Sequence, residues 1–365
     1  MQTLSKNQQE ALNLIIKKPI CIVTGPPGSG KTTLITSILQ SFLIDKVVIL
    51  TPTGCSAERI QSSLSIKNVF TIANIKSNTS LINNNQNKIV VIDEGSLASI
   101  TDGVFIFAQL HPEKLILLGD SKQIPCINGD SLLLTMLEIN TIPKIFLNND
   151  NFRQVRESYL KNLINYLHSH DTLPDDFLLD HDNSLLIKKF DSEAHIFDEL
   201  KRILVNNDYP PQILTLTNAE CDKIDGLLSH NENEVKVMCT ANYYATSGKK
   251  RVLAVANGQF GIKKGEMICY DNGFTDTKEC TKYRNALSMT INKSQGKEFN
   301  EQGIILILNQ NMLTLEHLYT GLSRFKTRVS IYTTHSITFS NLSFNKVQKR
   351  NKFIIDFLVN NKTIL

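Results

Sequence analysis

The sequence contains no tryptophan, and its seven cysteines include no Cys-x-x-Cys pair. An odd number of scattered cysteines argues against a disulfide framework or a cysteine-based zinc site and is typical of free thiols in a reducing compartment. No apolar run approaches the ~20 residues that a membrane-spanning helix needs. Residues 1–6 also lack the apolar segment of a secretion signal. We therefore expect an intracellular protein without a membrane partner, in the cytoplasm or, for a viral protein, in the nucleus of a host cell.

The excess of charge is also small. The chain has 39 lysine and arginine residues against 35 aspartate and glutamate residues, a formal net charge of +4. This mild basicity is compatible with nucleic-acid binding but does not demonstrate it. Hydrophobic residues make up 41% of the 365 positions, which is ordinary for a globular protein and enough for two domains with separate cores.

What the sequence does contain is a phosphate-binding loop. Residues 25–32 read Gly-Pro-Pro-Gly-Ser-Gly-Lys-Thr, between an apolar strand-like run at 20–23 and a helical pattern at 33–42. Glycines let backbone N–H groups turn inward around phosphates, and a helix N-terminus adds partial positive charge. We expect Lys31 to reach the β- and γ-phosphates of ATP, and the Thr32 hydroxyl to help hold Mg²⁺. The other residues expected to bind the nucleotide in this segment are Gly25, Pro26, Gly28, Ser29, Gly30 and Thr33.

Two carboxylates form the second chemical element. Asp93 and Glu94 directly follow the apolar run at 89–92, and in parallel sheets the ends of strands meet at the edge where ligands bind. Asp93 is predicted to hold Mg²⁺ through water, and Glu94 to polarise the water that attacks the γ-phosphorus. Because a nucleotide switch needs no base at this position, the glutamate favours an ATP hydrolase.

Apolar strand-like runs alternate with helical patterns along most of the chain. Besides those already named, such runs lie at residues 47–50, 115–118, 213–216, 303–308 and 329–332. This alternation predicts an α/β protein with parallel sheets and crossover helices. We expect an ATP-binding domain at 1–150, a second domain at 151–365 and a boundary near 148–151.

Further segments occur in a characteristic order. They are Leu4-x-x-x-Gln8-x-x-Ala11, Thr51-Pro52-Thr53-Gly54, Gly119-Asp120-Ser121-Lys122-Gln123-Ile124-Pro125, Asn151-Phe152-Arg153-Gln154, Asn257-Gly258-Gln259-Phe260-Gly261, Thr290-Ile291-Asn292-Lys293-Ser294-Gln295-Gly296-Lys297-Glu298-Phe299 and Leu318-Tyr319-Thr320-Gly321-Leu322-Ser323-Arg324. Together with the phosphate loop, this order resembles that of superfamily 1 helicases, and within them the RecD-like and Dda-like branch. The resemblance runs from about residue 4 to residue 332. One departure is Asn292, which stands where the family usually has histidine.

The resemblance implies a particular architecture. It predicts two RecA-like P-loop domains with parallel sheets and small or reduced insertions. The first domain would carry a short hairpin (1B) near residues 75–88, and the second domain (2A) a reduced, SH3-like insertion (2B) near 235–285. Because related motors use a longer hairpin to split the duplex, these short insertions favour translocation more strongly than strand separation.

The resemblance also implies roles for single residues. Gln8 would read adenine, Gln123 would sense the γ-phosphate, and Arg153 and Arg324 would contact it. An arginine supplied by the second domain would stabilise the charge of the transition state, which would couple hydrolysis to closure of a cleft between the domains. Gly296 and Glu298 would also lie at the nucleotide.

Nucleic-acid contacts are expected from hydroxyl groups and backbone N–H groups at loop ends, which suit phosphates. The candidates are Thr51, Thr53, Thr290 and Lys293. Stacking and charge along a channel would come from Tyr243, Tyr244, Phe260 and the basic run at 249–251.

These residues lead us to expect an ATP- and Mg²⁺-dependent helicase or translocase that moves on single-stranded DNA, 5′ to 3′ by resemblance. Replication or repair proteins are its expected partners. Three alternatives stay open. An RNA helicase of the viral superfamily 1 type shares several of the motifs, and an ATP-binding scaffold subunit of a replication or repair complex would not unwind. A small-molecule P-loop kinase would leave the motifs after residue 150 unexplained.

Overall fold

The chain divides into two compact units, one formed by residues 1–154 and 345–365 and the other by residues 155–344. The computed structural model describes residues 4–127, 129–147, 158–175, 177, 182–206, 210–227, 235–247, 250–277, 281–300, 302–339 and 342–344, with the backbone alone at 246, 247 and 250–252. The boundary predicted near 148–151 and the terminal segment after residue 344 lie outside these residues.

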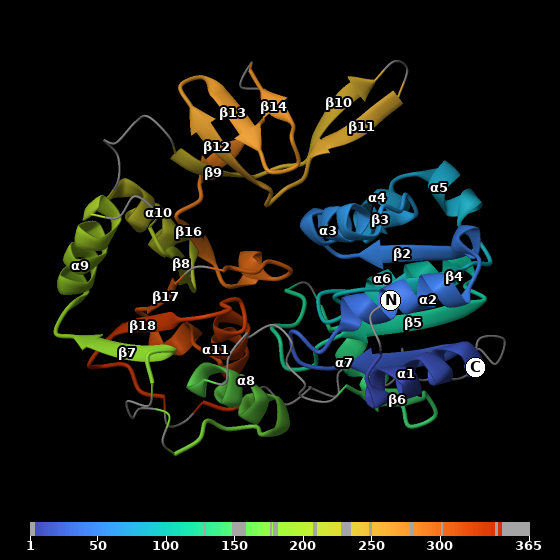
Figure 1. Cartoon of the computed structure of the whole chain (residues 1–365), viewed down its shortest axis with the longest axis horizontal. Helices are drawn as coiled ribbons and strands as arrows, with labels where there is room; N and C mark the ends of the chain where they lie inside the picture. The colour runs from blue at the N-terminus through green and yellow to red at the C-terminus, as the bar shows by residue number, and fades with distance from the viewer. Residues whose placement is uncertain are drawn as a thin grey trace. The chain divides into compact units, whose positions relative to one another are not determined.

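A six-stranded parallel sheet forms the first unit, in the order β3-β2-β4-β5-β1-β6 (Figure 1). Its strands are β1 (Ile20–Thr24), β2 (Val47–Thr51), β3 (Val69–Thr71), β4 (Ile89–Ile92), β5 (Lys114–Gly119) and β6 (Lys144–Phe146). Strands β1, β2 and β4 are buried along their whole length, as expected for a parallel sheet with helices on both faces. The apolar runs near 20, 47, 89 and 115 are therefore confirmed as strands.

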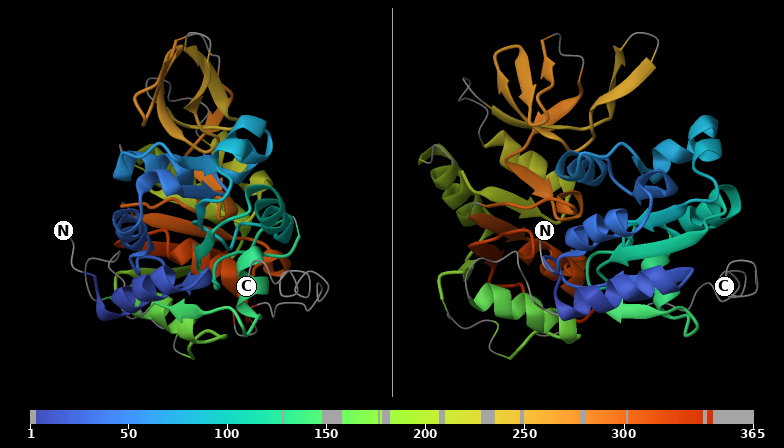
Figure 2. Two further views of the ribbon diagram at one scale, coloured as in Figure 1. Left: turned by 90° about the vertical axis from the view of Figure 1, so that its right-hand side faces the viewer. Right: turned by 45° about the vertical axis from the view of Figure 1, so that its right-hand side comes forward.

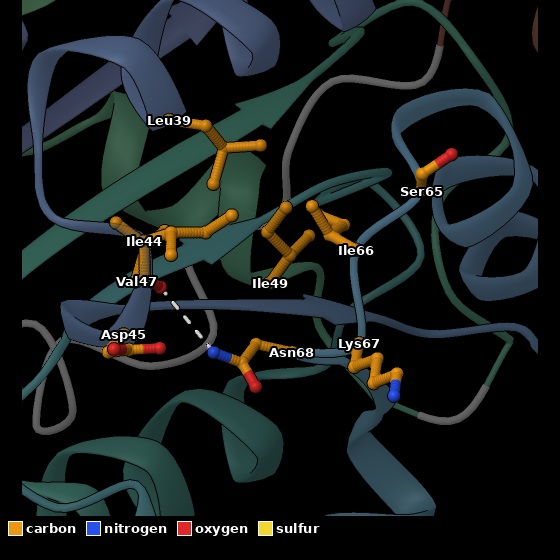
Figure 3. A pocket seen from close by; sticks show the side chains of 9 residues that line it. All are labelled: Leu39, Ile44, Asp45, Val47, Ile49, Ser65, Ile66, Lys67 and Asn68. Atoms are coloured by element: carbon orange, nitrogen blue, oxygen red, sulfur yellow. Dashed lines mark hydrogen bonds between the residues drawn. The ribbon is translucent and has the colours of Figure 1, made fainter.

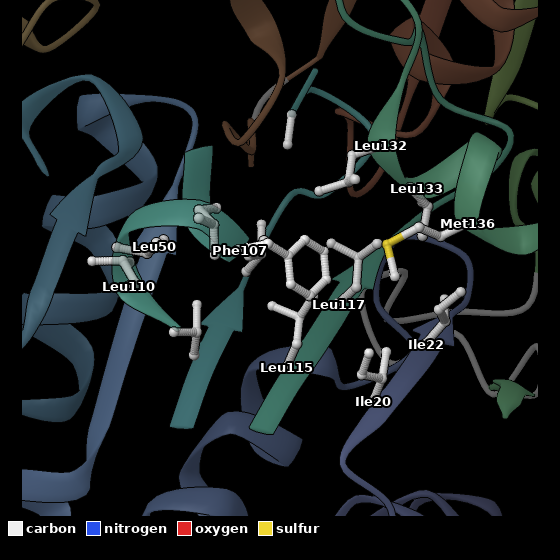
Figure 4. Close-up of a cluster of buried hydrophobic side chains, with 14 of the residues drawn as sticks. Ile20, Ile22, Leu50, Phe107, Leu110, Leu115, Leu117, Leu132, Leu133 and Met136 are labelled. Carbon is white, nitrogen blue, oxygen red and sulfur yellow. The ribbon is translucent and has the colours of Figure 1, made fainter. Parts of the chain in front are cut away.

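Helices cover both faces of this sheet. They are α1 (Lys6–Lys17), α2 (Lys31–Ser41), α3 (Gly54–Leu64), α4 (Ile72–Lys76), α5 (Thr79–Asn84), α6 (Ile100–Phe105) and α7 (Leu132–Leu137), with shorter turns at Ile44–Lys46 and Ile106–Leu110. Because side chains alternate across a strand, β1 contributes Ile20 and Ile22 to one core cluster and Cys21 and Val23 to the other. Figure 4 shows the first cluster, in which Met136 of α7 packs with the sheet.

The short β-hairpin expected near residues 75–88 is wrong. That segment contains the end of α4 and the whole of α5. The Asn78 side chain caps α5 by accepting a hydrogen bond from the N–H of Leu81 at 3.2 Å, and Leu81 and Ile82 pack against the first core cluster. Local capping and burial of these two side chains stabilise a helix here.

The second unit contains a five-stranded parallel sheet in the order β16-β8-β17-β18-β7. Its elements are β7 (Leu185–Phe190), β8 (Gln212–Thr215), β16 (Ser288–Thr290), β17 (Gly303–Ile307), β18 (Val329–Thr334), α8 (Tyr159–Ser169), α9 (Glu193–Asn206), α10 (Asn218–Gly226) and α11 (Leu315–Leu322). The predicted α/β class with two parallel sheets is confirmed. In the described part of the chain, no helix combines the length and hydrophobicity of a membrane crossing.

An antiparallel insertion interrupts the second unit. One five-stranded sheet has the order β14-β13-β12-β9-β15, and β10 and β11 form a separate ribbon (Figure 2). The strands are β9 (Val235–Cys239), β10 (Tyr243–Ser247), β11 (Lys250–Val255), β12 (Phe260–Lys264), β13 (Met267–Tyr270), β14 (Thr275–Asp276) and β15 (Tyr283–Asn285). The small insertion expected in this part of the chain is confirmed.

The two units share one strand–turn–helix structure, which follows the sequence Ile-Leu-Thr-x-Thr at 49–53 and again at 213–217. Thr51 Oγ1 donates to the carbonyl of Thr53 at 2.8 Å, and Thr215 Oγ1 donates to that of Thr217 at 2.9 Å. Thr53 then caps α3, and Thr217 caps α10. The same local hydrogen bonds therefore begin a helix at the carboxyl end of a strand in each unit.

Packing in the second unit generates a stability prediction at Gly303, the first residue of β17. A Cβ atom there would lie 1.9 Å from Cε1 of Phe325, so Gly303→Ala should lower the free energy of unfolding by about 1–3 kcal/mol. Gly226→Ala is the matched control, because a Cβ atom at that position has no heavy atom within 4 Å. Urea unfolding followed by circular dichroism measures both, and equal midpoints would contradict the tight contact.

Candidate active site

The phosphate loop joins β1 to α2 and is shaped by two glycines. Gly28 and Gly30 both have φ of +82°, a left-handed conformation that side chains rarely adopt. At Gly30 a Cβ atom would also lie 2.1 Å from Nε2 of Gln8. The loop therefore turns directly into α2, where Thr32 and Thr33 occupy the first turn and Thr32 is exposed. The N–H groups and partial positive charge of this turn suit a phosphate.

Lys31 begins α2 and folds its side chain back over the loop. Its Nζ donates to the carbonyl of Gly25 at 2.7 Å and to that of Pro26 at 2.9 Å. Ser29 Oγ lies 3.5 Å from the same ammonium group. The positive charge thus lies within the turn, where phosphate oxygens can replace these carbonyl acceptors.

Gln8 lies on α1 and uses both ends of its amide within the protein. Its Oε1 accepts from the N–H of Ser5 at 3.0 Å in a capping box, and its Nε2 donates to the carbonyl of Ser29 at 3.1 Å. Gln8 therefore ties the start of the chain to the phosphate loop. Its contact with adenine stays a prediction.

The acidic pair closes β4, two strands away from the phosphate loop in the sheet order. Asp93 is buried, and Glu94 has φ of +56°, a strain of about 1–3 kcal/mol that is common at functional sites. Burial first, and the charge of Glu94 second, raise the pKa of Asp93 to about 6 against the opposing charges of Arg59 and Lys31. An Arg59 nitrogen, Nη2, lies 3.6 Å from Asp93 Oδ2 and 3.6 Å from Glu94 Oε1.

Gln123 follows β5, the strand that lies between β4 and β1. It is buried, and its Nε2 donates to Oδ2 of Asp120 at 3.3 Å. Its Oε1 has no hydrogen-bond partner among the described residues, and a buried acceptor without a partner is unusual outside functional sites. The N–H of Ser121 donates to Oγ1 of Thr24 at 3.2 Å, which ties this segment to the start of the phosphate loop. Lys31, Glu94 and Gln123 thus come from three adjacent strand ends of one sheet edge.

The residues of this edge fit a magnesium ion. Mg²⁺ prefers oxygen ligands and binds through one or two carboxylates together with phosphates and waters. Asp93 offers a buried carboxylate whose pKa is raised, and Thr32 offers an exposed hydroxyl. Within the described residues, no group of three or more His, Cys, Asp and Glu side chains could hold a metal ion. The cation would therefore depend on the nucleotide for further ligands.

Arg324 is buried in the second unit and is held there by its own neighbours. Its Nε donates to the carbonyl of Thr320 at 3.1 Å, and its Nη1 to that of Lys297 at 3.3 Å. Its Nη2 donates to Oγ of Ser323 at 2.9 Å. A role on the γ-phosphate would require the guanidinium to exchange some of these bonds. Arg153, the other predicted arginine, lies outside the described residues.

Lys297 connects the segment at 290–299 to the insertion, a role that no sequence pattern indicated. Its Nζ donates to the carbonyl of Gly258 at 2.5 Å and lies 3.9 Å from the ring centroid of Phe260. Lys236 approaches the same ring at 4.9 Å. Two ammonium groups therefore lie close to the Phe260 ring in cation–π contacts. The backbone carbonyl of Lys297 accepts a hydrogen bond from Arg324, so Lys297 contacts both the insertion and Arg324.

The other residues predicted near the nucleotide from the second unit are Gly296 and Glu298. Gly296 is buried with φ of +77°, and Glu298 pairs with Lys326 at 3.4 Å. Gly296 therefore lies in a turn that needs glycine, and Glu298 lies at the surface of its unit. Their contact with nucleotide stays a prediction.

The predicted nucleic-acid residues lie at strand ends in both units. Thr51 is buried and Thr53 caps α3. Thr290 pairs with Thr215 across β16 and β8, and the exposed Lys293 donates from Nζ to Oδ1 of Asn218 at 2.9 Å. Thr217, the cap of α10, was not predicted, although the repeated Ile-Leu-Thr-x-Thr was the signal that could have identified it.

A separate cavity of about 320 Å³ lies in the first unit (Figure 3). It is lined by Leu39, Ile44, Asp45, Val47, Ile49, Ser65, Ile66, Lys67 and Asn68. Strand β2 begins at Val47 and ends at Thr51, so the cavity lies at the amino end of this strand. It is therefore not part of the candidate active site, which lies at the carboxyl ends.

The raised pKa of Asp93 generates a pH prediction. Between its ordinary value of 3.8 and about 6, the folded protein holds a proton that the unfolded chain has lost, so charging Asp93 costs stability as the pH rises through this window. Asp93→Asn should therefore stabilise the nucleotide-free protein by about 1–3 kcal/mol at pH 7.5, and by much less at pH 4.5. Urea midpoints at both pH values measure the gain.

Asp102 supplies the control with the opposite sign. Although burial opposes them, hydrogen bonds from Lys76 and Ser99 lower the pKa of Asp102. Its charged form is thus favoured by folding, and Asp102→Asn should destabilise the protein at pH 7.5. If Asp93→Asn and Asp102→Asn change the free energy of unfolding equally at pH 7.5, the raised pKa of Asp93 is contradicted.

Comparison with known proteins shows what this chain resembles. Residues 3–183 match the model of a family described as an AAA domain. RecD of the RecBCD enzyme from Haemophilus influenzae is 30% identical over 172 residues, which cover 37% of this chain and 27% of that protein. RecD from Buchnera aphidicola subsp. Acyrthosiphon pisum is 23% identical over 448 aligned positions, covering 94% of this chain and 74% of the relative.

Solved structures share the fold over the whole chain. The Pif1 helicase from Bacteroides in complex with ADP-AlF3 and single-stranded DNA has a TM-score of 0.63 at 18% identity, covering 100% of this chain and 98% of that one. The Pif1 helicase from Candida albicans has a TM-score of 0.59 at 17% identity, covering 100% of both chains. The chain is therefore similar to RecD proteins of the superfamily 1 helicases over most of its length, and its two parallel sheets with their antiparallel insertion share the fold of the Pif1 helicases.

Proposed function

We propose that this chain is an ATP- and Mg²⁺-dependent DNA helicase or translocase that moves on single-stranded DNA in the 5′-to-3′ direction. The observation that supports it most is the meeting of Lys31, Glu94 and Gln123 at one sheet edge, from three adjacent strands. The likeness to a Pif1 helicase bound to ADP-AlF3 and single-stranded DNA supports the choice of nucleotide and track.

In the proposed reaction, the N–H groups of the phosphate loop and the Lys31 ammonium bind the β- and γ-phosphates. Thr32 and Asp93 would hold Mg²⁺, and the bound ion would supply positive charge at the phosphate oxygens. Glu94 orients and polarises the attacking water. Because Glu94 is held in a left-handed conformation directly after a buried strand, its carboxylate needs little reorganisation for this task.

For the second unit, we propose that Arg324 stabilises the transition state and that the Thr217 turn contacts the nucleic-acid backbone as the Thr53 turn does. The matching strand–turn–helix structures support equivalent contacts from the two units. Transfer of Arg324 from its carbonyl acceptors to phosphate would link the reaction to the segment that includes Lys297. Gly296 and Glu298 belong to that segment.

A second candidate function is an ATP-binding subunit of a replication or repair complex that does not unwind DNA. Helix α5, which stands where only a short hairpin was expected, favours this candidate. Steady-state ATPase rates without nucleic acid, with single-stranded DNA and with RNA of the same sequence separate the possibilities. Stimulation by DNA supports the proposed motor, a stronger response to RNA favours an RNA helicase, and turnover that ignores both favours the scaffold subunit.

Two substitutions in the first unit distinguish nucleotide binding from ATP hydrolysis. Lys31→Ala should abolish nucleotide binding or turnover, because the charge inside the loop is lost. Glu94→Gln should bind ATP with the affinity of the wild type but stop hydrolysis, because an amide cannot act as the base. Fluorescent-nucleotide titration and phosphate release measure the two steps, and full turnover by Glu94→Gln would remove its assigned role.

Arg324→Ala should leave ATP affinity within a few-fold of the wild type and lower turnover by ~10³ or more. Because Arg324 is buried and makes hydrogen bonds to its own unit, the melting temperature must be measured beside the kinetics. A loss of turnover with a retained melting temperature supports the catalytic role. Unchanged turnover rules it out.

A further inference from the structure

Arg59 contacts both carboxylates of the candidate active site, and no motif of the sequence assigned it a role. Its Nη2 lies 3.6 Å from one oxygen of Asp93 and 3.6 Å from one of Glu94. The Asp93 and Glu94 side chains are 5% and 12% exposed, whereas the Arg59 side chain is 34% exposed. Direct charged hydrogen bonds are about 2.7–2.9 Å long. The guanidinium is therefore shared between the two carboxylates and held closely by neither.

Helix α3 connects these carboxylates to the candidate nucleic-acid turn. Thr53 caps the helix through the N–H of Ser56 at 3.3 Å, and Arg59 follows six residues later. At about 1.5 Å of rise per residue, the capped end and Arg59 are about 9 Å apart along one helix. A displacement of the Thr53 turn would therefore move the backbone of Arg59 with it, because both lie on one short helix.

We propose that Arg59 is a positioning residue that restrains Asp93 and Glu94 until nucleic-acid phosphate engages the turn at the start of α3. This inference rests on the proposed ATP hydrolase function. The Arg59 charge competes with Mg²⁺ for the oxygens of Asp93, and its attraction to Glu94 reduces the negative charge available to polarise water. A shift of α3 by less than about 1 Å is enough to turn a 3.6 Å separation into a direct bond or to release it.

A purely structural ion pair would behave differently. It would contribute to the melting temperature, and its loss would leave metal binding and the response to nucleic acid unchanged. A positioning role instead predicts that removing the charge eases Mg²⁺ binding and raises hydrolysis in the absence of nucleic acid. The two roles therefore differ in Mg²⁺ affinity, which is measured without turnover.

The test compares Arg59→Gln, Arg59→Lys and the wild type. Lys223→Gln is the matched control, because Lys223 occupies the position of Arg59 in the repeated strand–turn–helix of the second unit and pairs with Glu193 at 3.7 Å. In Arg59→Gln, the Mg²⁺ concentration that half-saturates binding of fluorescent ADP should fall about 3- to 10-fold. ATPase activity without nucleic acid should rise, and its stimulation by single-stranded DNA should fall, by a similar factor.

The conservative Arg59→Lys variant keeps the charge and should lie between Arg59→Gln and the wild type in both measurements. Lys223→Gln should match the wild type. A Mg²⁺ midpoint and a stimulation factor within about two-fold of the wild type in Arg59→Gln would overturn the proposal, with or without a lower melting temperature. If the wild type binds Mg²⁺ and ADP but does not hydrolyse ATP, the proposed function fails, and the Mg²⁺ midpoints alone still decide the role of Arg59.

Discussion

The constraint on which the first unit depends is the burial of one carboxylate beside another at the end of a strand. Asp93 has almost no contact with solvent, its pKa is raised, and Glu94 directly follows it in a strained conformation. Such a pair is unfavourable in isolation and persists because the surrounding sheet fixes it. The same burial that opposes the charge makes the site attractive to a divalent cation. Strands β4, β5 and β1 thus hold the Asp93 and Glu94 carboxylates in this unfavourable arrangement.

In the second unit, the buried Arg324 side chain forms hydrogen bonds with its own neighbours. Arg324 bonds to two backbone carbonyls and one hydroxyl of its own unit, which satisfies most of its donors. One of these carbonyls belongs to Lys297, whose ammonium group reaches the turn at Gly258 and the Phe260 ring of the insertion. A change at the guanidinium therefore has a short covalent and hydrogen-bonded route to the insertion, entirely inside one unit.

Sequence reasoning predicted the elements whose signals are local. The phosphate loop, Asp93 and Glu94 all follow buried apolar runs, and these runs became strands because parallel sheets bury both faces. The segment near 75–88 was misjudged because its hairpin was expected from the resemblance, whereas the local capping by Asn78 begins a helix. Arg59 and Lys297 could not have been identified, because their partners lie on other elements and only folding brings them together.

The contact between Gln8 and Gly30 has an evolutionary consequence. The amide of Gln8 fills the space that any side chain at position 30 would need, and it also holds the loop through Ser29. A substitution of Gln8 removes the hydrogen bond to Ser29, and a side chain at position 30 clashes with the Gln8 amide. Each of the two positions therefore limits which residues the other can accept. A shorter side chain at position 8 would remove the clash but not the backbone strain, because the φ of +82° at Gly30 also opposes any side chain there.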